Sequence, residues 1–131
     1  MVTGVQTCAL PISLVELYRR WSYNDQAAAV AQQGTLHVAP AESGELWFEL
    51  GMAHDAKRDD DKAIEAFTRA IAGKPDDLGS KFQRGQVYFR KGDFVNAKRD
   101  LDEVARSSDP AVASTKPLAV QMLGQIARKP R

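Results

Sequence analysis

The chain has 131 residues, which is enough for one domain with a buried core, and its single cysteine excludes an internal disulfide framework. Eighteen Lys and Arg residues against seventeen Asp and Glu residues leave a net charge of +1, whereas a nucleic-acid-binding protein needs a basic excess to displace counterions from phosphates. No apolar run approaches the roughly 18 residues of a membrane-spanning helix. Composition and charge therefore argue against nucleic-acid binding and against a membrane span.

The first thirteen residues differ from the rest of the chain. Residues 1–13 carry no charge and include Gly4 and Pro11, which are unfavourable in a helix. The string from Val2 to Ile12 resembles the conceptual translation of a short sequencing adapter read in one frame. A secretory signal is the alternative, but it would need a positively charged start and a small-residue cleavage site. We expect residues 1–13 to be an artefactual or disordered segment, with the native N-terminus missing.

The next segment, residues 14–43, is predicted to be a degenerate helical hairpin. Four apolar side chains recur at the i, i+3, i+4 and i+7 spacing of an amphipathic helix: Leu14, Leu17, Tyr18 and Trp21. A second helix follows around Ala28 and ends before Pro40, although Gly34 is unfavourable within it.

A clearer helix pair is predicted for residues 44–77. Gly51 lies in an apolar helix at a cost of about 1 kcal/mol relative to alanine, which is acceptable where a partner helix must come close. Ala63 would offer a small surface to that contact, and Pro75 ends the second helix. Large apolar side chains are expected around the contact: Trp47, Leu50, Phe67 and Ile71.

The same pattern returns 34 residues later, in residues 78–111. Five pairs share this spacing: Phe48 and Phe82, Gly51 and Gly85, His54 and Tyr88, Ala63 and Ala97, Phe67 and Leu101. In both copies an aspartate, Asp59 or Asp93, is expected to cap the start of the second helix. The period equals the length of one tetratricopeptide repeat, a helix–turn–helix unit.

The signature residues of that family are present in both copies. The first copy has Trp47, Leu50, Gly51, Ala63, Phe67, Ala70 and Pro75, with His54 in the place of a tyrosine. The second copy keeps Gly85, Tyr88, Ala97 and Leu101, but has Arg84 where leucine is usual. The chain thus resembles the tetratricopeptide-repeat family. This resemblance implies an all-α solenoid of about three antiparallel helix pairs and a C-terminal capping helix, spanning residues 14–131.

Residues 112–131 are predicted to form that capping helix. Pro117 suits a first helical turn, and an apolar stripe follows at Leu118, Met122, Leu123 and Ile126. The dipeptide Leu123–Gly124 repeats Leu50–Gly51, so the helix could instead be the first of a truncated repeat. Polar residues on its outer face favour the cap: Gln121, Gln125, Arg128 and Lys129.

No pattern typical of catalysis is found in the sequence. His37, His54 and Cys8 do not fall at metal-ligand spacing, and the run Asp59–Asp61 lacks the alternating ligands of a calcium loop. Neither a glycine-rich phosphate loop nor a nucleophile elbow is present. We therefore predict a protein that is not an enzyme and that needs no metal or cofactor.

The family resemblance implies a binding surface instead. In this family the first helices of successive repeats line a concave groove that holds an extended peptide or a partner helix. The positions that match are Phe48, Met52, Asp55, Phe82, Gln86, Phe89, Gln121 and Gln125. Aromatic residues and methionine among them suit an apolar anchor on the partner, although the sequence leaves open whether Phe82 belongs to the groove or to the core.

The predicted function is protein–protein recognition, with another protein or a peptide as partner, in a bacterial-type scaffold or assembly factor. One alternative is the accessory tail of a larger, truncated enzyme or envelope protein. Another is a helical-repeat RNA binder, which the near-neutral charge disfavours. The sequence leaves the identity of the partner, the compartment and the oligomeric state open.

Overall fold

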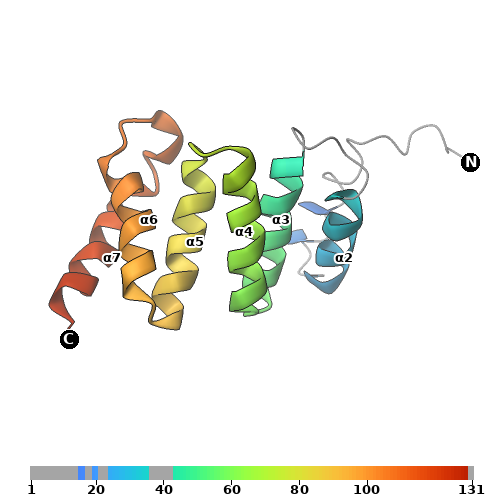
Figure 1. The fold of residues 1–131 in the computed structure, drawn as a ribbon, viewed down its shortest axis with the longest axis horizontal. Coiled ribbons are helices and arrows are strands. Elements are labelled where there is room, and N and C mark those ends of the chain that lie inside the picture. The colour runs from blue at the N-terminus through green and yellow to red at the C-terminus, as the bar shows by residue number, and fades with distance from the viewer. Residues whose placement is uncertain (1–14, 17–18, 21–23, 36–42, 130–131) are drawn as a thin grey trace, which may run out of the picture. The chain divides into compact units, whose positions relative to one another are not determined.

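The computed structural model describes residues 15–16, 19–20, 24–35 and 43–129 (Figure 1). The helices are α2 (Asn24–Thr35), α3 (Ser43–Ala56), α4 (Asp60–Gly73), α5 (Leu78–Lys91), α6 (Phe94–Arg106), the 3-10 turn η2 (Pro110–Val112) and α7 (Lys116–Arg128). These described residues contain helices and no strand, so the all-α prediction is confirmed. The predicted N-terminal segment 1–13 and the apolar residues Leu14, Leu17, Tyr18 and Trp21 lie outside the described residues.

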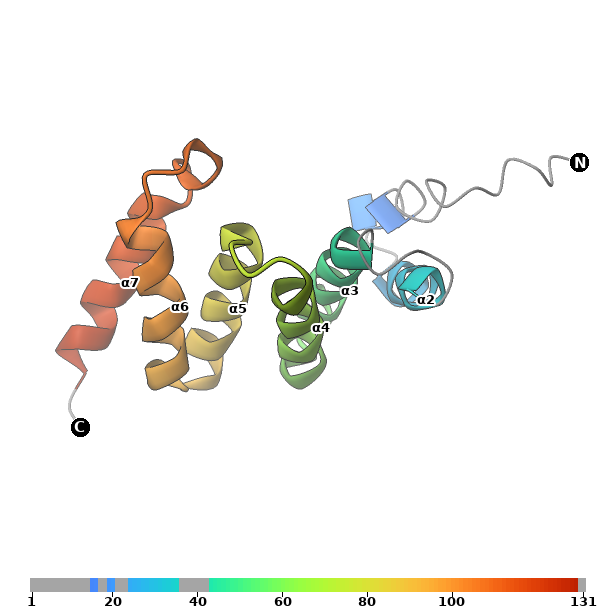
Figure 2. The ribbon, with the colours of Figure 1, turned by 45° about the horizontal axis from the view of Figure 1, so that its top comes forward.

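Two compact units divide the chain, Met1–Pro75 and Asp76–Arg131. In the first unit α3 packs against α2 on one side and against α4 on the other (Figures 1 and 2). In the second unit α6 packs against both α5 and α7. The predicted repeats 44–77 and 78–111 each contain one helix pair, α3 with α4 and α5 with α6.

The core of the first unit is built from small side chains around a few large ones. Its buried cluster is Val15, Ala27, Ala28, Ala31, Leu50, Ala53 and Ala66, with Val30 and Trp47 packed against it. Phe67 and Leu46 are also fully buried. Alanines on α2 and α4 let the helix axes approach, because a small residue leaves room for the neighbouring backbone.

The second unit has a core of its own. It consists of Phe82, Ala97, Leu101, Val104, Val112, Ala119 and Met122, with Leu78, Tyr88, Phe89, Leu123 and Ile126 partly buried against it. Val112 enters this core from η2, so the segment between α6 and α7 contributes to packing.

The two inter-helix turns differ. Between α5 and α6, Gly92 adopts the left-handed conformation with φ of 84°, and Asp93 caps α6 by accepting a hydrogen bond from the Asn96 amide at 3.3 Å. Between α3 and α4 the left-handed residue is Arg58, with φ of 62°, and Asp59 makes no side-chain capping bond. The prediction of an aspartate cap is therefore correct for α6 and wrong for α4.

Each repeat glycine lies against a large side chain of the second helix. A Cβ atom built on Gly51 would lie 2.6 Å from Cε1 of Phe67. At Gly85 the nearest atom would be Cγ of Leu101, at 3.0 Å. The alanines predicted to face the glycines are fully buried, but the atoms nearest to the glycines belong to Phe67 and Leu101. Bare backbone is needed because these side chains pack directly onto it.

Candidate functional site

The predicted groove residues of the first unit lie along one face of α3. Phe48, Met52 and Asp55 follow the i, i+4, i+7 spacing that aligns side chains on a helix, and each is half-buried. The ring of Phe48 packs against that of Phe67, with centroids 5.8 Å apart and planes inclined by 57°. This face of α3 is therefore partly accessible, and its Phe48 ring also belongs to the contact between α3 and α4.

Phe82 is the one predicted groove residue that the structure places in a core. It is 4% exposed and belongs to the buried cluster of the second unit. The sequence left open whether Phe82 belongs to the groove or to the core, and the structure places it in the core. Its ring fills space between the helices of the unit, so it does not offer open surface.

The other two α5 positions remain partly accessible. Gln86 and Phe89 are half-buried. The Phe89 ring meets Phe94, the first residue of α6, edge to face with centroids 5.6 Å apart. The ammonium group of Lys129 lies 5.0 Å from the centroid of the Phe94 ring, within cation–π range. Sequence reasoning missed this aromatic pair, because Phe89 and Phe94 belong to different helices that meet only when α5 packs on α6.

On α7 the two predicted residues differ in exposure. Gln121 is exposed and Gln125 is half-buried. Both present amide groups, which donate and accept hydrogen bonds and so suit the backbone of an extended peptide.

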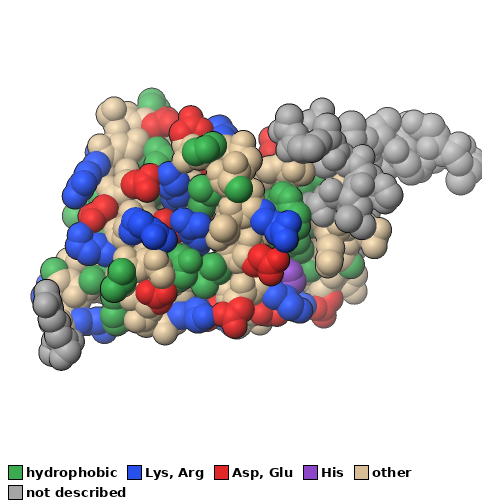
Figure 3. All heavy atoms as spheres, in the orientation of Figure 1, with side chains coloured by type: hydrophobic (Ala, Val, Ile, Leu, Met, Phe, Trp, Pro, Cys, Tyr) green, Lys and Arg blue, Asp and Glu red, His purple; other side chains and the backbone are tan. Residues whose placement is uncertain are grey.

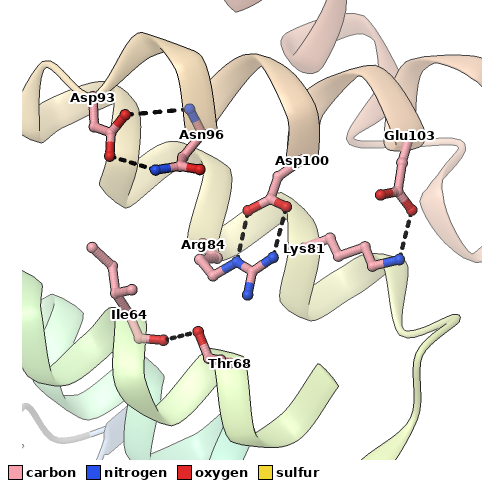
Figure 4. Close-up of polar contacts among 8 residues, drawn as sticks. All are labelled: Ile64, Thr68, Lys81, Arg84, Asp93, Asn96, Asp100 and Glu103. Atoms are coloured by element: carbon pink, nitrogen blue, oxygen red, sulfur yellow. Dashed lines mark hydrogen bonds and ion pairs between the residues drawn. The ribbon is translucent and has the colours of Figure 1, made fainter. Parts of the chain in front are cut away.

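A buried ion pair links α5 and α6 of the second unit (Figure 4). Arg84 on α5 donates two hydrogen bonds to the carboxylate of Asp100 on α6, from Nε at 2.7 Å and from a terminal nitrogen at 2.8 Å. Asp100 is 1% exposed. The hydrogen bonds to this carboxylate raise the pKa of Arg84, against the opposing effect of burial. An arginine in a leucine position was the sequence signal, because a buried cation needs an anion opposite it.

Other polar contacts support the same helix pair. Lys81 of α5 donates a hydrogen bond to Glu103 of α6 at 2.5 Å (Figure 4). The side chain of Asp93 accepts hydrogen bonds from the backbone and the side chain of Asn96, and these bonds lower the pKa of Asp93.

The first unit contains a surface pocket of about 350 Å³, lined by Glu16, Arg19, Arg20 and Glu49. Glu49 is 9% exposed and pairs with Arg19. Two cations and two anions line the pocket, so its charges balance. The pair joins Arg19 to α3 across 30 positions of the sequence.

His54 occupies the tyrosine position of the first repeat. Its Nδ1 atom is buried and has no hydrogen-bond partner among the described residues. Burial is the largest cause of a lowered pKa for this histidine. The nearby Lys57 and Lys62 lower it further, while Asp59 and Glu65 oppose the shift.

The surface charges are mixed in sign. On the face drawn in Figure 3, Lys and Arg side chains are interspersed with Asp and Glu side chains. Ion pairs at i,i+4 spacing include Arg69 with Glu65 at 3.5 Å and Arg106 with Asp102 at 4.0 Å. Among the residues that the structure describes, no group of three or more His, Cys, Asp or Glu side chains is arranged to hold a metal ion. None of the described helices is both long and apolar enough to cross a membrane.

Comparison with known proteins gives a family match for part of the chain and structural matches for most of it. Residues 44–77 match the family model of the tetratricopeptide repeat. No curated protein matches the sequence. Solved structures do match: the type III secretion translocator chaperone SycD of Yersinia enterocolitica superposes with a TM-score of 0.84 at 16% identity, covering 91% of this chain and 82% of that one.

Two further structures of SycD agree. Its complex with a peptide of the translocator YopD gives a TM-score of 0.84 at 16% identity and covers 91% of both chains. An alternative dimer gives 0.86 at 16% identity, over 97% of this chain and 96% of that one. Residues 44–77 thus match the tetratricopeptide repeat, and the described residues have a tetratricopeptide-repeat-like fold.

Proposed function

We propose that this chain is a non-enzymatic protein-binding module that holds a peptide or helix of a partner protein against the first helices of its repeats. Within this proposal, Phe48 and Met52 supply apolar contact on α3 of the first unit. On the second unit, Gln86 and Gln125 supply hydrogen bonds and Phe89 supplies apolar contact.

The observation that carries the proposal is that equivalent positions on the two first helices are partly accessible. Met52 on α3 and Gln86 on α5 are 34 residues apart and both half-buried, and so are Asp55 and Phe89. Phe48 adds a half-buried ring on the same face of α3. Partly buried aromatics and methionine dominate the energetics of protein interfaces.

The comparison adds support from another protein of this fold. SycD of Yersinia enterocolitica has been solved in complex with a peptide of the translocator YopD. At 16% identity this likeness concerns the fold, so the partner of the present chain is proposed only as a class: an unfolded or helical segment with an apolar anchor.

A library experiment tests the proposal directly. The full chain is used to select binders from a displayed peptide library, and the selected peptide is titrated calorimetrically against variants. We expect Met52→Glu and Gln86→Glu to weaken binding roughly tenfold or more, because each places a charge in the contact. The matched control is Val95→Glu on α6, a position 82% exposed on a second helix. Unchanged affinity for both groove variants would contradict the proposal.

Phe82→Ala serves a different purpose. Because Phe82 lies in the core, its truncation is expected to lower the free energy of unfolding by about 3–5 kcal/mol. It therefore measures stability, and the binding test uses only the accessible positions.

A further inference from the structure

Helix α7 packs on the preceding helix with the same register that α3 uses. Aligning Gly124 with Gly51 pairs four positions along the two helices: Ala119 with Leu46, Met122 with Glu49, Leu123 with Leu50, and Ile126 with Ala53. In α3 all four are buried, and in α7 the matching residues are buried or half-buried. The similar burial of these aligned positions supports the alignment of Leu123–Gly124 with Leu50–Gly51. In this alignment α7 corresponds to the first helix of a repeat.

The face of α7 that carries Gly124 is open, whereas the equivalent faces of α3 and α5 are covered by the next helix. Gly51 lies against Phe67 of α4, and Gly85 lies against Leu101 of α6. A Cβ built on Gly124 meets no atom of the described residues within 4 Å. The neighbouring positions are also accessible, since Val120 is 54% exposed and Ala127 is exposed. We call the surface formed by Val120, Gly124 and Ala127 the α7 open face.

We propose that the α7 open face is a second docking site, distinct from the groove, for an antiparallel amphipathic helix of a partner protein. The chain itself shows what covers this kind of surface, because in both complete repeats an antiparallel second helix does so. That helix carries a buried alanine and, four residues later, a buried phenylalanine or leucine that lies against the glycine of the first helix. A partner helix with this spacing presents its large side chain to the bare backbone of Gly124.

Charge defines the partner helix further. In α4 the first turn carries Asp60 and Asp61, and these acids lie at the end where α3 finishes, as the short turn between the helices requires. Helix α7 contains no acidic residue and ends with Arg128, followed by Lys129. The N-terminus of an antiparallel partner would lie at this basic end. An acidic first turn on the partner therefore complements α7 and also meets its own helix dipole favourably.

The chain supplies a suitable probe, because α4 has all of these features. A synthetic peptide of residues 59–75 is made with a lactam between Glu65 and the lysine of Arg69→Lys, two exposed positions, so that it is helical in isolation. The labelled peptide is titrated into the full chain, and binding is followed by fluorescence anisotropy. We expect saturable binding that is at least about tenfold weaker for the peptide variant Phe67→Ala.

Variants on α7 locate the site. Gly124→Phe and Val120→Asp are expected to weaken binding of the probe roughly tenfold or more, since the first blocks close approach and the second buries a charge. Leu118→Asp is the matched control, because Leu118 is 41% exposed on another side of the same helix and should change affinity less than about twofold. Circular dichroism melting of each variant confirms that α7 is folded.

Several results would overturn the proposal. Binding of the probe no tighter than that of its scrambled sequence would do so, and so would full affinity in Gly124→Phe. If the chain alone self-associates in sedimentation and Gly124→Phe abolishes this, the occupant is a second copy and the partner-protein assignment is wrong. Probe binding that is lost in Met52→Glu but retained in Gly124→Phe would place the probe in the proposed groove and would also overturn the α7 site.

Discussion

The two complete helix pairs share one repeat frame but stabilise it with different chemistry. In the first pair, Leu50 and Ala66 are apolar members of the core. Thirty-four residues later the same two positions are Arg84 and Asp100, which form the buried ion pair. The comparison shows that the frame depends on the glycine contact and on helix packing, while the pair of residues beside it tolerates either apolar or paired charged side chains.

The turns and helix starts of the two pairs also differ. The second pair has a glycine at its left-handed turn position and aspartates that cap both α5 and α6. The first pair has Arg58 at the left-handed position and an uncapped start of α4. The second pair therefore has the better local signals, whereas the first relies more on apolar packing around Phe67.

Among the features that differ between the two pairs, the ion pair should give the largest effect when it is broken. Asp100→Ala removes the carboxylate that pairs with the guanidinium of Arg84, whose side chain is 11% exposed, and should lower the free energy of unfolding by about 3 kcal/mol. Urea unfolding followed by circular dichroism measures this loss.

The first repeat provides the control for that experiment. Arg84→Leu combined with Asp100→Ala transplants the apolar pair Leu50 and Ala66, and should bring the stability back to within about 1 kcal/mol of the parent. A double variant as unstable as Asp100→Ala alone would show that the charged pair is required by the second repeat.

The glycine contacts give the next effect in size. Gly51→Ala should lower the free energy of unfolding by about 2 kcal/mol, because the buried ring of Phe67 cannot move away from a new methyl group. Gly85→Ala should have a smaller effect, since Leu101 needs to shift by only a few tenths of an ångström and alanine favours the helix by about 1 kcal/mol. Thermal melting of both variants checks this order, and equal losses would contradict it.

The turns are expected to respond more weakly. Gly92→Ala should destabilise the second pair by about 1 kcal/mol, because alanine is strained at a φ of 84°. Arg58→Gly relieves the corresponding strain in the first pair, but glycine's freedom in the unfolded chain offsets most of the gain. Hydrogen exchange across the two turns measures both changes, and a stabilising Gly92→Ala would refute the comparison.

The smallest effect depends on pH and concerns the first pair only. The pKa of His54 is lowered by burial, so below the ordinary value of about 6.5 the unfolded chain takes up the proton more readily than the folded one. The free energy of unfolding should therefore fall as the pH is lowered through and below that value. His54→Tyr, which copies Tyr88 of the second pair, should remove this part of the pH dependence.

The measurement is the difference in unfolding free energy between parent and His54→Tyr at about pH 7.5 and about pH 5.5. The variant should gain stability relative to the parent at the lower pH. A difference independent of pH would show that the protonation of His54 is not linked to unfolding.

Much of the fold is predictable because its signals are local. The recurrence of glycine, alanine and a large apolar residue at a spacing of 34, as in Gly51 and Gly85, is readable along the chain and identifies the helix pairs. The end of α4 before Pro75 and the start of α6 after Asp93 follow from backbone chemistry that involves only a few neighbouring residues.

The candidate site is less predictable, because exposure depends on what packs against a residue. Phe48 and Phe82 occupy equivalent positions, yet the first is half-buried and the second is in a core. The periodicity of a helix states which residues share a face, but not which face a neighbouring helix covers. For that reason the residues predicted for the groove remain a proposal, even though their helices are established.

Three features were decided by tertiary packing alone. The side chain that meets Gly51 is Phe67, the anion that meets Arg84 is Asp100, and the surface around Gly124 is met by no second helix among the described residues. Local pattern specifies the helices because hydrogen bonding and side-chain periodicity act within about one turn. Contacts between residues 16 or more positions apart arise only when whole helices pack, so they are properties of the assembled core.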